Sequence, residues 1–334
     1  MSFMINNDDF SNLKWALQKN EFMKKNLFNE FQNNPEYLKI LDNLILDIKK
    51  SDTKNIQEKF IGSPTIFDFH SSIYELEVGN KFLKNNYYIE FYSDKQSQVT
   101  LPDFYATNSK YEYEVEVTHL IQDDSLDKLI NYLKNQKYKK FPLQIILNMN
   151  NELATLLLSP PYNNNKTRIK QIIGEGINEY KSEINKMPII NNYIEINTKM
   201  GSINIKKLKL NINNNLIVIG WEIIYLPITN RIKEIVKRIA MKKSSLKKEK
   251  PERVILVFII FDELKLITSQ SIKFMLESAL LDENNGIFNA KQNINNIGAV
   301  IGKHVNKYFV FINPNSRDNL LNPNFKDDIK FLNE

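Results

Sequence analysis

Residues 111–118 read Tyr-Glu-Tyr-Glu-Val-Glu-Val-Thr, an unbroken alternation of aromatic or apolar side chains with polar ones. Successive side chains of a β-strand point to opposite faces, so this alternation predicts a strand with one apolar face. The other face carries three carboxylates and a hydroxyl, from Glu112, Glu114, Glu116 and Thr118. A solvated edge strand and a cation-binding strand both suit the pattern, so the neighbouring segments have to distinguish them.

Helices and strands are expected to alternate on both sides of this stretch. Helical spacing of apolar residues covers much of 8–60, and further helices are expected at 71–83, 127–139, 167–186, 228–243 and 271–281. Apolar and β-branched runs predict strands at 87–92, 100–105, 143–149, 193–197, 203–212, 216–225, 254–261, 297–301 and 308–312. The run 254–261 is apolar throughout, which is typical of a central strand covered on both faces.

This order of elements predicts a mixed α/β fold, in which helices flank one central sheet. We expect a helical N-terminal segment at 1–60 and an α/β domain at 61–334. The domain carries an insertion at about 143–227.

Composition excludes several kinds of chemistry. The chain of 334 residues has no cysteine and three histidines, which rules out disulfides, cysteine-ligated zinc, iron–sulfur clusters and thiolate catalysis. Any bound metal must therefore be held mainly by oxygen. The Gly174-Glu175-Gly176 stretch lacks the lysine and hydroxyl of a P-loop, so nucleoside triphosphate hydrolysis is not expected.

The longest apolar runs are too short to span a bilayer, which predicts a soluble chain with no membrane partner. The first ten residues contain two aspartates and lack a basic region followed by a hydrophobic stretch. We therefore expect no secretion signal and a cytoplasmic location.

Positive charge is concentrated in one segment. Residues 231–250 contain nine Lys or Arg and two Glu, a local balance of +7 in a chain of net charge +6. The rest of the chain is therefore close to neutral. A localised basic stripe suits a polyanion such as nucleic acid, although many lysine-rich helical faces are simply solvated.

Three short motifs occur in an order that resembles the PD-(D/E)XK nuclease superfamily. They are Glu75-Leu76-Glu77 in an expected helix, Leu101-Pro102-Asp103-Phe104 at the start of a strand, and the acidic strand 113–118. The resemblance implies a restriction endonuclease-like core, in which Asp103 and an acid of the next strand lie side by side on a β-hairpin. It also implies Mg²⁺ or Mn²⁺ as cofactor.

The resemblance assigns roles to individual residues. Asp103 corresponds to the first metal-binding aspartate, and Glu75 to a helical glutamate that some members use as an additional ligand. The second acid is either Glu114, with Glu116 at the usual lysine position as in Glu-x-Glu variants, or Glu116, with Thr118 at that position. Both alternatives remain open at this point.

The lysine of the motif is missing, and in most members it positions the attacking water and stabilises the transition state. Some members supply a lysine from a helix that faces the site. Lys242 is our first choice for this role and Lys243 the second. His119 is a further candidate base or phosphate contact, although a lone histidine at a strand end is more often structural.

The chemistry of these residues also favours a metal-dependent nuclease. A divalent cation held by carboxylates can activate water and relieve charge on a phosphodiester, and Mg²⁺ prefers oxygen ligands. Clustered carboxylates without a cation would repel each other. A glycosidase that uses Glu114 and Glu116 is disfavoured, because residues two apart on one strand do not lie on opposite sides of a sugar.

We therefore expect a metal-dependent endonuclease whose substrate is double-stranded DNA, with a role in restriction or defence. The phosphate backbone is expected to contact Lys237, Arg238, Lys242, Lys243 and Lys247. The N-terminal segment and the insertion would serve target selection or homodimer contacts. The alternative is a catalytically inactive module of the same fold that binds nucleic acid or a protein partner.

Overall fold

The computed structural model confirms a mixed α/β chain with two sheets. It describes residues 10–30, 34–51, 55–61, 66–92, 101–120, 128–129, 131–132, 143–150, 153, 156, 166–188, 192, 194–209, 216–219, 221–262, 264, 267–292, 294–318 and 324–333. Two compact units divide the chain. Unit 1 comprises Met1–His119, Ile235–Asp262 and Leu280–Glu334, and unit 2 comprises Leu120–Glu234 and Glu263–Ala279. The predicted insertion at 143–227 thus lies within unit 2.

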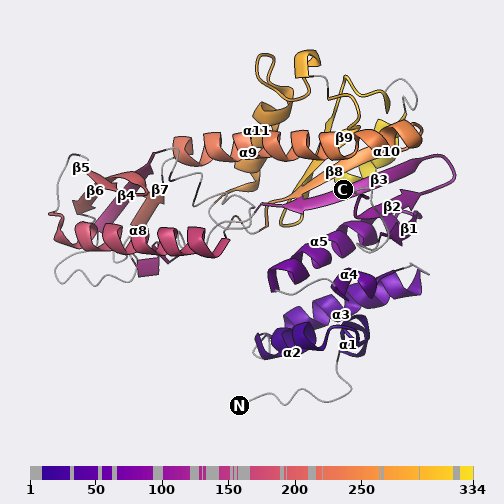
Figure 1. The fold of residues 1–334 in the computed structure, drawn as a ribbon, viewed down its shortest axis with the longest axis horizontal. Coiled ribbons are helices and arrows are strands. Elements are labelled where there is room, and N and C mark those ends of the chain that lie inside the picture. The colour runs from indigo at the N-terminus through magenta and orange to yellow at the C-terminus, as the bar shows by residue number, and fades with distance from the viewer. Residues whose placement is uncertain are drawn as a thin grey trace. The chain divides into compact units, whose positions relative to one another are not determined.

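Unit 1 is built on a six-stranded sheet in the order β1-β2-β3-β8-β9-β10 (Figure 1). The first three strands are antiparallel, β3, β8 and β9 run parallel, and β10 returns antiparallel to β9. The strands are β1 (Tyr88–Phe91), β2 (Phe104–Thr107), β3 (Glu112–His119), β8 (Val254–Ile260), β9 (Ala299–His304) and β10 (Lys307–Ile312). The helices are α1 (Ser11–Ala16), α2 (Glu21–Glu30), α3 (Pro35–Lys50), α4 (Glu58–Ile61), α5 (Ile66–Leu83), α10 (Ser244–Glu249), α13 (Phe325–Asp328) and the short η1 (Ala290–Gln292) and η2 (Ile329–Asn333).

The acidic stretch forms β3, as the alternation predicts. Strand β3 pairs with β2 along one edge and with β8 along the other. All seven residues of β8 are buried, which confirms the central strand expected from its apolar run. The parallel register sets Glu114 opposite Ile255 and Glu116 opposite Val257. The acids of β3 therefore lie beside a strand that has no charged side chain of its own.

The helices at the start of the chain share one core with this sheet. Helix α3 begins at Pro35, and the preceding Asn34 caps it, its side-chain oxygen accepting from Tyr37 N at 3.3 Å. Its buried residues recur every three or four positions, which gives the helix one apolar face. That face packs against α5, and α5 in turn packs against the side of β3 that carries Tyr113, Val115 and Val117 (Figure 1). The opposite side of β3 carries the acids.

Unit 2 contains a four-stranded sheet in the order β5-β6-β4-β7. Its strands are β4 (Leu143–Met149), β5 (Ile194–Thr198), β6 (Gly201–Lys209) and β7 (Leu216–Ile219), and its long helix is α8 (Lys166–Lys186). Helices α9 (Trp221–Lys242) and α11 (Ser269–Leu281) have residues in both units. None of the helices in the described ranges combines the length and the apolar character that a bilayer-spanning helix requires.

The prediction of a strand at 216–225 is confirmed for 216–219 and is wrong from residue 221 onward. Strand β7 ends at Ile219, and α9 begins at Trp221, so the helix starts seven residues before the predicted position and contains Pro227. A short apolar run does not distinguish a strand from a buried helical turn by periodicity. The helix expected at 127–139 falls largely outside the described residues.

Candidate active site

The start of β2 places Asp103 against the backbone of β3. The backbone N–H of Asp103 donates to Val115 O at 2.9 Å, and its carboxylate Oδ2 accepts from the N–H of Val117 at 2.6 Å. Burial raises the pKa of Asp103 well above its usual value, and the negative charges of Glu75 and Glu116 raise it further. Lys59 and the Val117 N–H oppose this shift in pKa. Asp103 is therefore close enough to Glu75 of α5 and to Glu116 of β3 for each of them to repel its carboxylate.

Glu116 is held by a buried lysine. The Nζ of Lys243 lies 2.7 Å from Glu116 Oε2, and the lysine side chain is only 1% exposed, compared with 18% for the glutamate. Lys243 follows the last residue of α9, and its N–H donates to Ile239 O at 2.9 Å. A lysine this deeply buried needs a carboxylate partner. The ion pair therefore holds the end of α9 against β3.

Glu75 has a similar partner. The Nζ of Lys59, in α4, lies 2.7 Å from Glu75 Oε2, and both side chains are largely buried. Glu77, two residues further along α5, pairs instead with Lys303 of β9 at 3.2 Å. We define the acidic cluster as Glu75, Asp103 and Glu116, with the flanking lysines Lys59 and Lys243.

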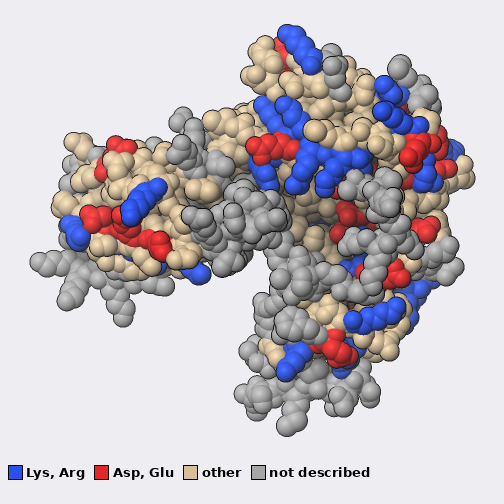
Figure 2. Space-filling model, in the orientation of Figure 1, with Lys and Arg blue, Asp and Glu red and all other residues tan. Residues whose placement is uncertain are grey.

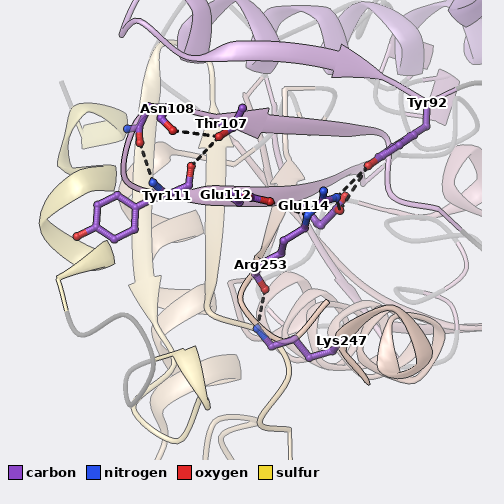
Figure 3. A network of polar contacts seen from close by, with 8 residues as sticks. All are labelled: Tyr92, Thr107, Asn108, Tyr111, Glu112, Glu114, Lys247 and Arg253. Atoms are coloured by element: carbon purple, nitrogen blue, oxygen red, sulfur yellow. Dashed lines mark hydrogen bonds and ion pairs between the residues drawn. The ribbon is translucent and has the colours of Figure 1, made fainter. Parts of the chain in front are cut away.

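Glu114 lies on the same face of β3 but in a different network (Figure 3). Its side chain is fully buried and forms an ion pair with Arg253, while the hydroxyl of Tyr92 donates to Glu114 Oε1 at 3.4 Å. Arg253 also binds Glu112 through its Nε, at 2.8 Å, and its guanidinium lies 4.1 Å from the ring centre of Tyr105. Burial raises the pKa of Glu114, and Arg253 opposes that shift.

Lys247 of α10 contacts the same network through the backbone of Arg253. Its Nζ donates to the backbone oxygen of Arg253 at 2.6 Å (Figure 3). The same ammonium group forms a buried ion pair with Asp318. Asp318 in turn accepts from the hydroxyl of Ser316 at 3.0 Å. The contacts fix the residue that enters β8 and hold Arg253 against the acids of β3.

The predicted cations divide into exposed and buried groups. Lys237, Arg238 and Lys242 are exposed, and Lys and Arg side chains gather along α9 on the face drawn in Figure 2. Lys243 and Lys247 are buried against Glu116 and Asp318. The structure therefore corrects two expectations: Lys243 rather than Lys242 contacts the acidic cluster, and neither buried lysine presents its ammonium group at the surface.

The two remaining candidates lie on opposite faces of β3. Thr118 shares the face of Glu116 and is half-buried. His119 points to the other face, is 5% exposed, and packs its ring 5.6 Å from that of Tyr74. His119 therefore belongs to the packing of α5 on the sheet.

Sequence reasoning missed Lys59 and Arg253. Lys59 lies between α3 and α5 in a segment without a motif, and nothing in its surroundings signals a partner on α5. Arg253 comes directly before the apolar run of β8, and a cation at the entrance of a buried strand is a usable signal once the strand is known to lie beside β3.

The donor set of the acidic cluster fits a hard divalent cation, because all of its ligand atoms are carboxylate oxygens. A bound cation would also relieve the repulsion that raises the pKa of Asp103. Within the described ranges, however, no three Asp, Glu or His side chains already form a metal-ligand set. The lysines on Glu75 and Glu116 occupy the space beside two of the three acids.

Comparison of the chain with protein-family models, with curated proteins and with solved structures gave no match. The site therefore has to be interpreted from its own geometry and charge.

Proposed function

We propose that unit 1 is a metal-dependent nuclease with a restriction endonuclease-like core. One observation carries this proposal: burial raises the pKa of Asp103, and the negative charges of Glu75 and Glu116, which come from two other elements, raise it further. Buried like charges are unfavourable unless a cation or a chemical task requires them. Helix, hairpin and lysine-bearing helix end contribute to this site in the order that the resemblance implies.

In this proposal, Asp103 and Glu116 hold Mg²⁺ or Mn²⁺, and Glu75 is the additional acid. When bound, the ion supplies an activated water and neutralises charge on the phosphate. The Val117 N–H orients Asp103, and Lys243 orients Glu116. Lys243 also brings a positive charge to the site, which favours the charge that develops on the scissile phosphate.

Between the two sequence registers, the contacts favour Glu116 as the second acid, with Thr118 at the usual lysine position. Glu114 is neutralised by Arg253, whereas Glu116 interacts with Asp103. Lys243 then takes over the role of the absent motif lysine. Both glutamates have a cationic partner, so the choice rests on position: Glu116 is 18% exposed and acts on Asp103, whereas Glu114 is fully buried beside Arg253 and Tyr92.

The exposed cations Lys237, Arg238 and Lys242 suit the phosphate backbone of double-stranded DNA, which we propose as substrate. A role in restriction or defence rests on the family resemblance alone. Cytoplasmic action and a homodimer belong to the same proposal.

A cleavage assay on plasmid DNA with Mg²⁺ or Mn²⁺ tests the nuclease. We expect Asp103→Asn to reduce nicking at least about a hundredfold, since a metal ligand is lost while an acceptor for the Val117 N–H remains. Glu112→Gln is the matched control, because it removes a carboxylate from the same face of β3 outside the acidic cluster. Nicking retained in Asp103→Asn would contradict the proposal.

A second candidate is a catalytically silent module that binds nucleic acid or a protein partner. Lys59 and Lys243 favour it, because they already neutralise two of the three acids without a metal. This candidate predicts DNA binding with no cleavage at any tested metal, and binding that does not change in Asp103→Asn.

A further inference from the structure

A concave site apart from the acidic cluster lies on unit 1, formed by residues of α9 and α10, by the chain before β9 and by Arg317 after β10. It is a cavity of about 590 Å³. Its helical residues recur every three or four positions and share one side of the helices. On the helices they include Lys237, Ala240, Met241, Ser244 and Lys248.

The rim of this cavity is cationic. Lys237, Lys248 and Arg317 are exposed, and in the described part of the chain none of them forms an ion pair. No Asp or Glu occurs among the described lining residues. Lys247 also lines the cavity, but its ammonium group is committed to Asp318. Three positive charges therefore surround a hollow that contains no described counter-charge, which favours an anionic ligand.

Apolar side chains also line the cavity. Ala240, Met241 and Ile294 supply an apolar surface, and Met241 is 77% exposed although it is a large hydrophobic residue. An exposed, polarisable methionine is suited to contact with a flat aromatic ring. Small-molecule sites commonly have this combination of apolar surface and a few polar groups, in cavities of several hundred Å³.

Amide side chains complete the lining, from Gln292, Asn295 and Asn296. Two hydrogen bonds hold the segment that bears Asn295 and Asn296. Asn296 Nδ2 donates to Ala240 O at 2.6 Å, and Arg317 N donates to Asn295 O at 3.0 Å. Side-chain amides offer a donor and an acceptor together, which matches the edges of nucleobases.

We propose that this cavity binds a nucleotide, with the base on Met241 and Ile294 and the phosphate on Lys237, Lys248 and Arg317. The nucleotide comes either from the free pool or from an unpaired end of a nucleic-acid strand. Arg and Lys are the usual partners of phosphate. A site for phosphate alone needs no apolar surface, so the apolar lining residues favour a ligand that also carries a base. The proposal goes beyond the nuclease: it shares Lys237 with the proposed DNA contacts, but Lys248 and Arg317 belong to the cavity alone, and no residue of the acidic cluster lines it.

The test measures binding by titration calorimetry with AMP, dAMP, adenosine and inorganic phosphate, and with a short single-stranded oligodeoxynucleotide. Wild type and Asp103→Asn are both used, in EDTA, so that loss of nuclease function leaves the measurement intact. We expect Lys237→Ala and Arg317→Ala each to weaken nucleotide binding about tenfold, because each loses a charge-assisted contact. Met241→Glu places a negative charge on an exposed position and should weaken binding further.

Lys291→Ala is the matched control, since this exposed lysine neighbours Gln292 without lining the cavity. AMP or dAMP binding that only the lining variants weaken supports a free nucleotide. Binding of the oligonucleotide alone, weakened by Arg317→Ala, which changes no residue among the proposed contacts to duplex DNA, supports a strand end. The proposal is overturned if no probe binds, if inorganic phosphate binds as tightly as the nucleotides, or if Lys291→Ala weakens binding as much as Arg317→Ala.

Discussion

Glu114 and Glu116 lie two residues apart on one face of β3, yet their surroundings differ in kind. Glu114 is fully buried in the network of Arg253 and Tyr92, where one guanidinium binds both it and Glu112. Glu116 is partly exposed, pairs with Lys243, and adds to the repulsion that raises the pKa of Asp103. Strand alternation decides the face of a side chain, and segments distant in sequence decide its chemistry.

The largest effect should follow from breaking the Glu114 network. Arg253→Ala leaves Glu114 buried without its guanidinium, so we expect the free energy of unfolding to fall by about 3–5 kcal/mol. Urea unfolding measures this. Glu112→Gln is the control, since Glu112 is 41% exposed and its loss should cost no more than about 1 kcal/mol. Equal costs for the two variants would show that the Glu114 pair is not a structural contact.

The next effect separates the two lysines at the end of α9. Lys243→Ala removes the partner of Glu116, and we expect a loss of about 2 kcal/mol in unfolding free energy together with a large loss of cleavage. Lys242 is exposed, so Lys242→Ala should change stability by no more than about 0.5 kcal/mol. Unfolding curves and nicking rates at fixed Mg²⁺ measure both properties. If Lys242→Ala impairs cleavage as strongly as Lys243→Ala, the buried lysine has no special role.

A smaller effect concerns the pH dependence of stability. The pKa of Asp103 is raised in the folded protein, so the carboxyl is ionised more readily in the unfolded chain. Its contribution to stability is therefore full below the ordinary Asp pKa of about 3.9 and is lost as pH rises through the folded value. In EDTA, Asp103→Asn should become more stable relative to wild type as pH rises from about 4, a trend that urea unfolding across the pH range can follow. Wild type gaining on the variant over that range would mean that the acids do not repel.

Much of the frame was predictable from the sequence, because local pattern determines it. The alternation at 111–118 predicted β3 and the shared face of its acids, and the apolar run before Phe261 predicted a fully buried strand. Helical spacing also predicted α3 and α8, since each has one apolar side, and it predicted α5 from residue 71 onward, although that helix begins at Ile66.

The partners of the acids were not predictable, because they depend on long-range placement. Arg253 reaches Glu114 only because β8 lies parallel to β3 in a particular register, across more than a hundred residues of intervening chain. The choice between Lys242 and Lys243 depends on the rotation of the last turn of α9, which shifts by about 100° per residue. The buried positions Ile232, Ile235, Val236 and Ile239 continue at helical spacing to 243, so this pattern favoured Lys243, whereas the acid that it pairs with depends on the sheet.

The smallest effect sharpens the comparison of the two glutamates directly. If Glu116 binds the metal and Glu114 does not, Mn²⁺ should stabilise wild type by about 1.4 kcal/mol at a free concentration about ten times its Kd, because it binds only the folded protein. Thermal and urea unfolding with and without Mn²⁺ measure this gain. Glu116→Gln should lose it.

Glu114→Gln should keep the Mn²⁺ gain even though its stability without metal is lower, because its defect lies in the pairing with Arg253. The comparison uses the difference that Mn²⁺ makes within each variant, so differences in starting stability cancel. The reverse outcome, a gain kept in Glu116→Gln and lost in Glu114→Gln, would mean that the metal displaces Arg253. The register with Glu114 as second acid and Glu116 at the lysine position would then hold.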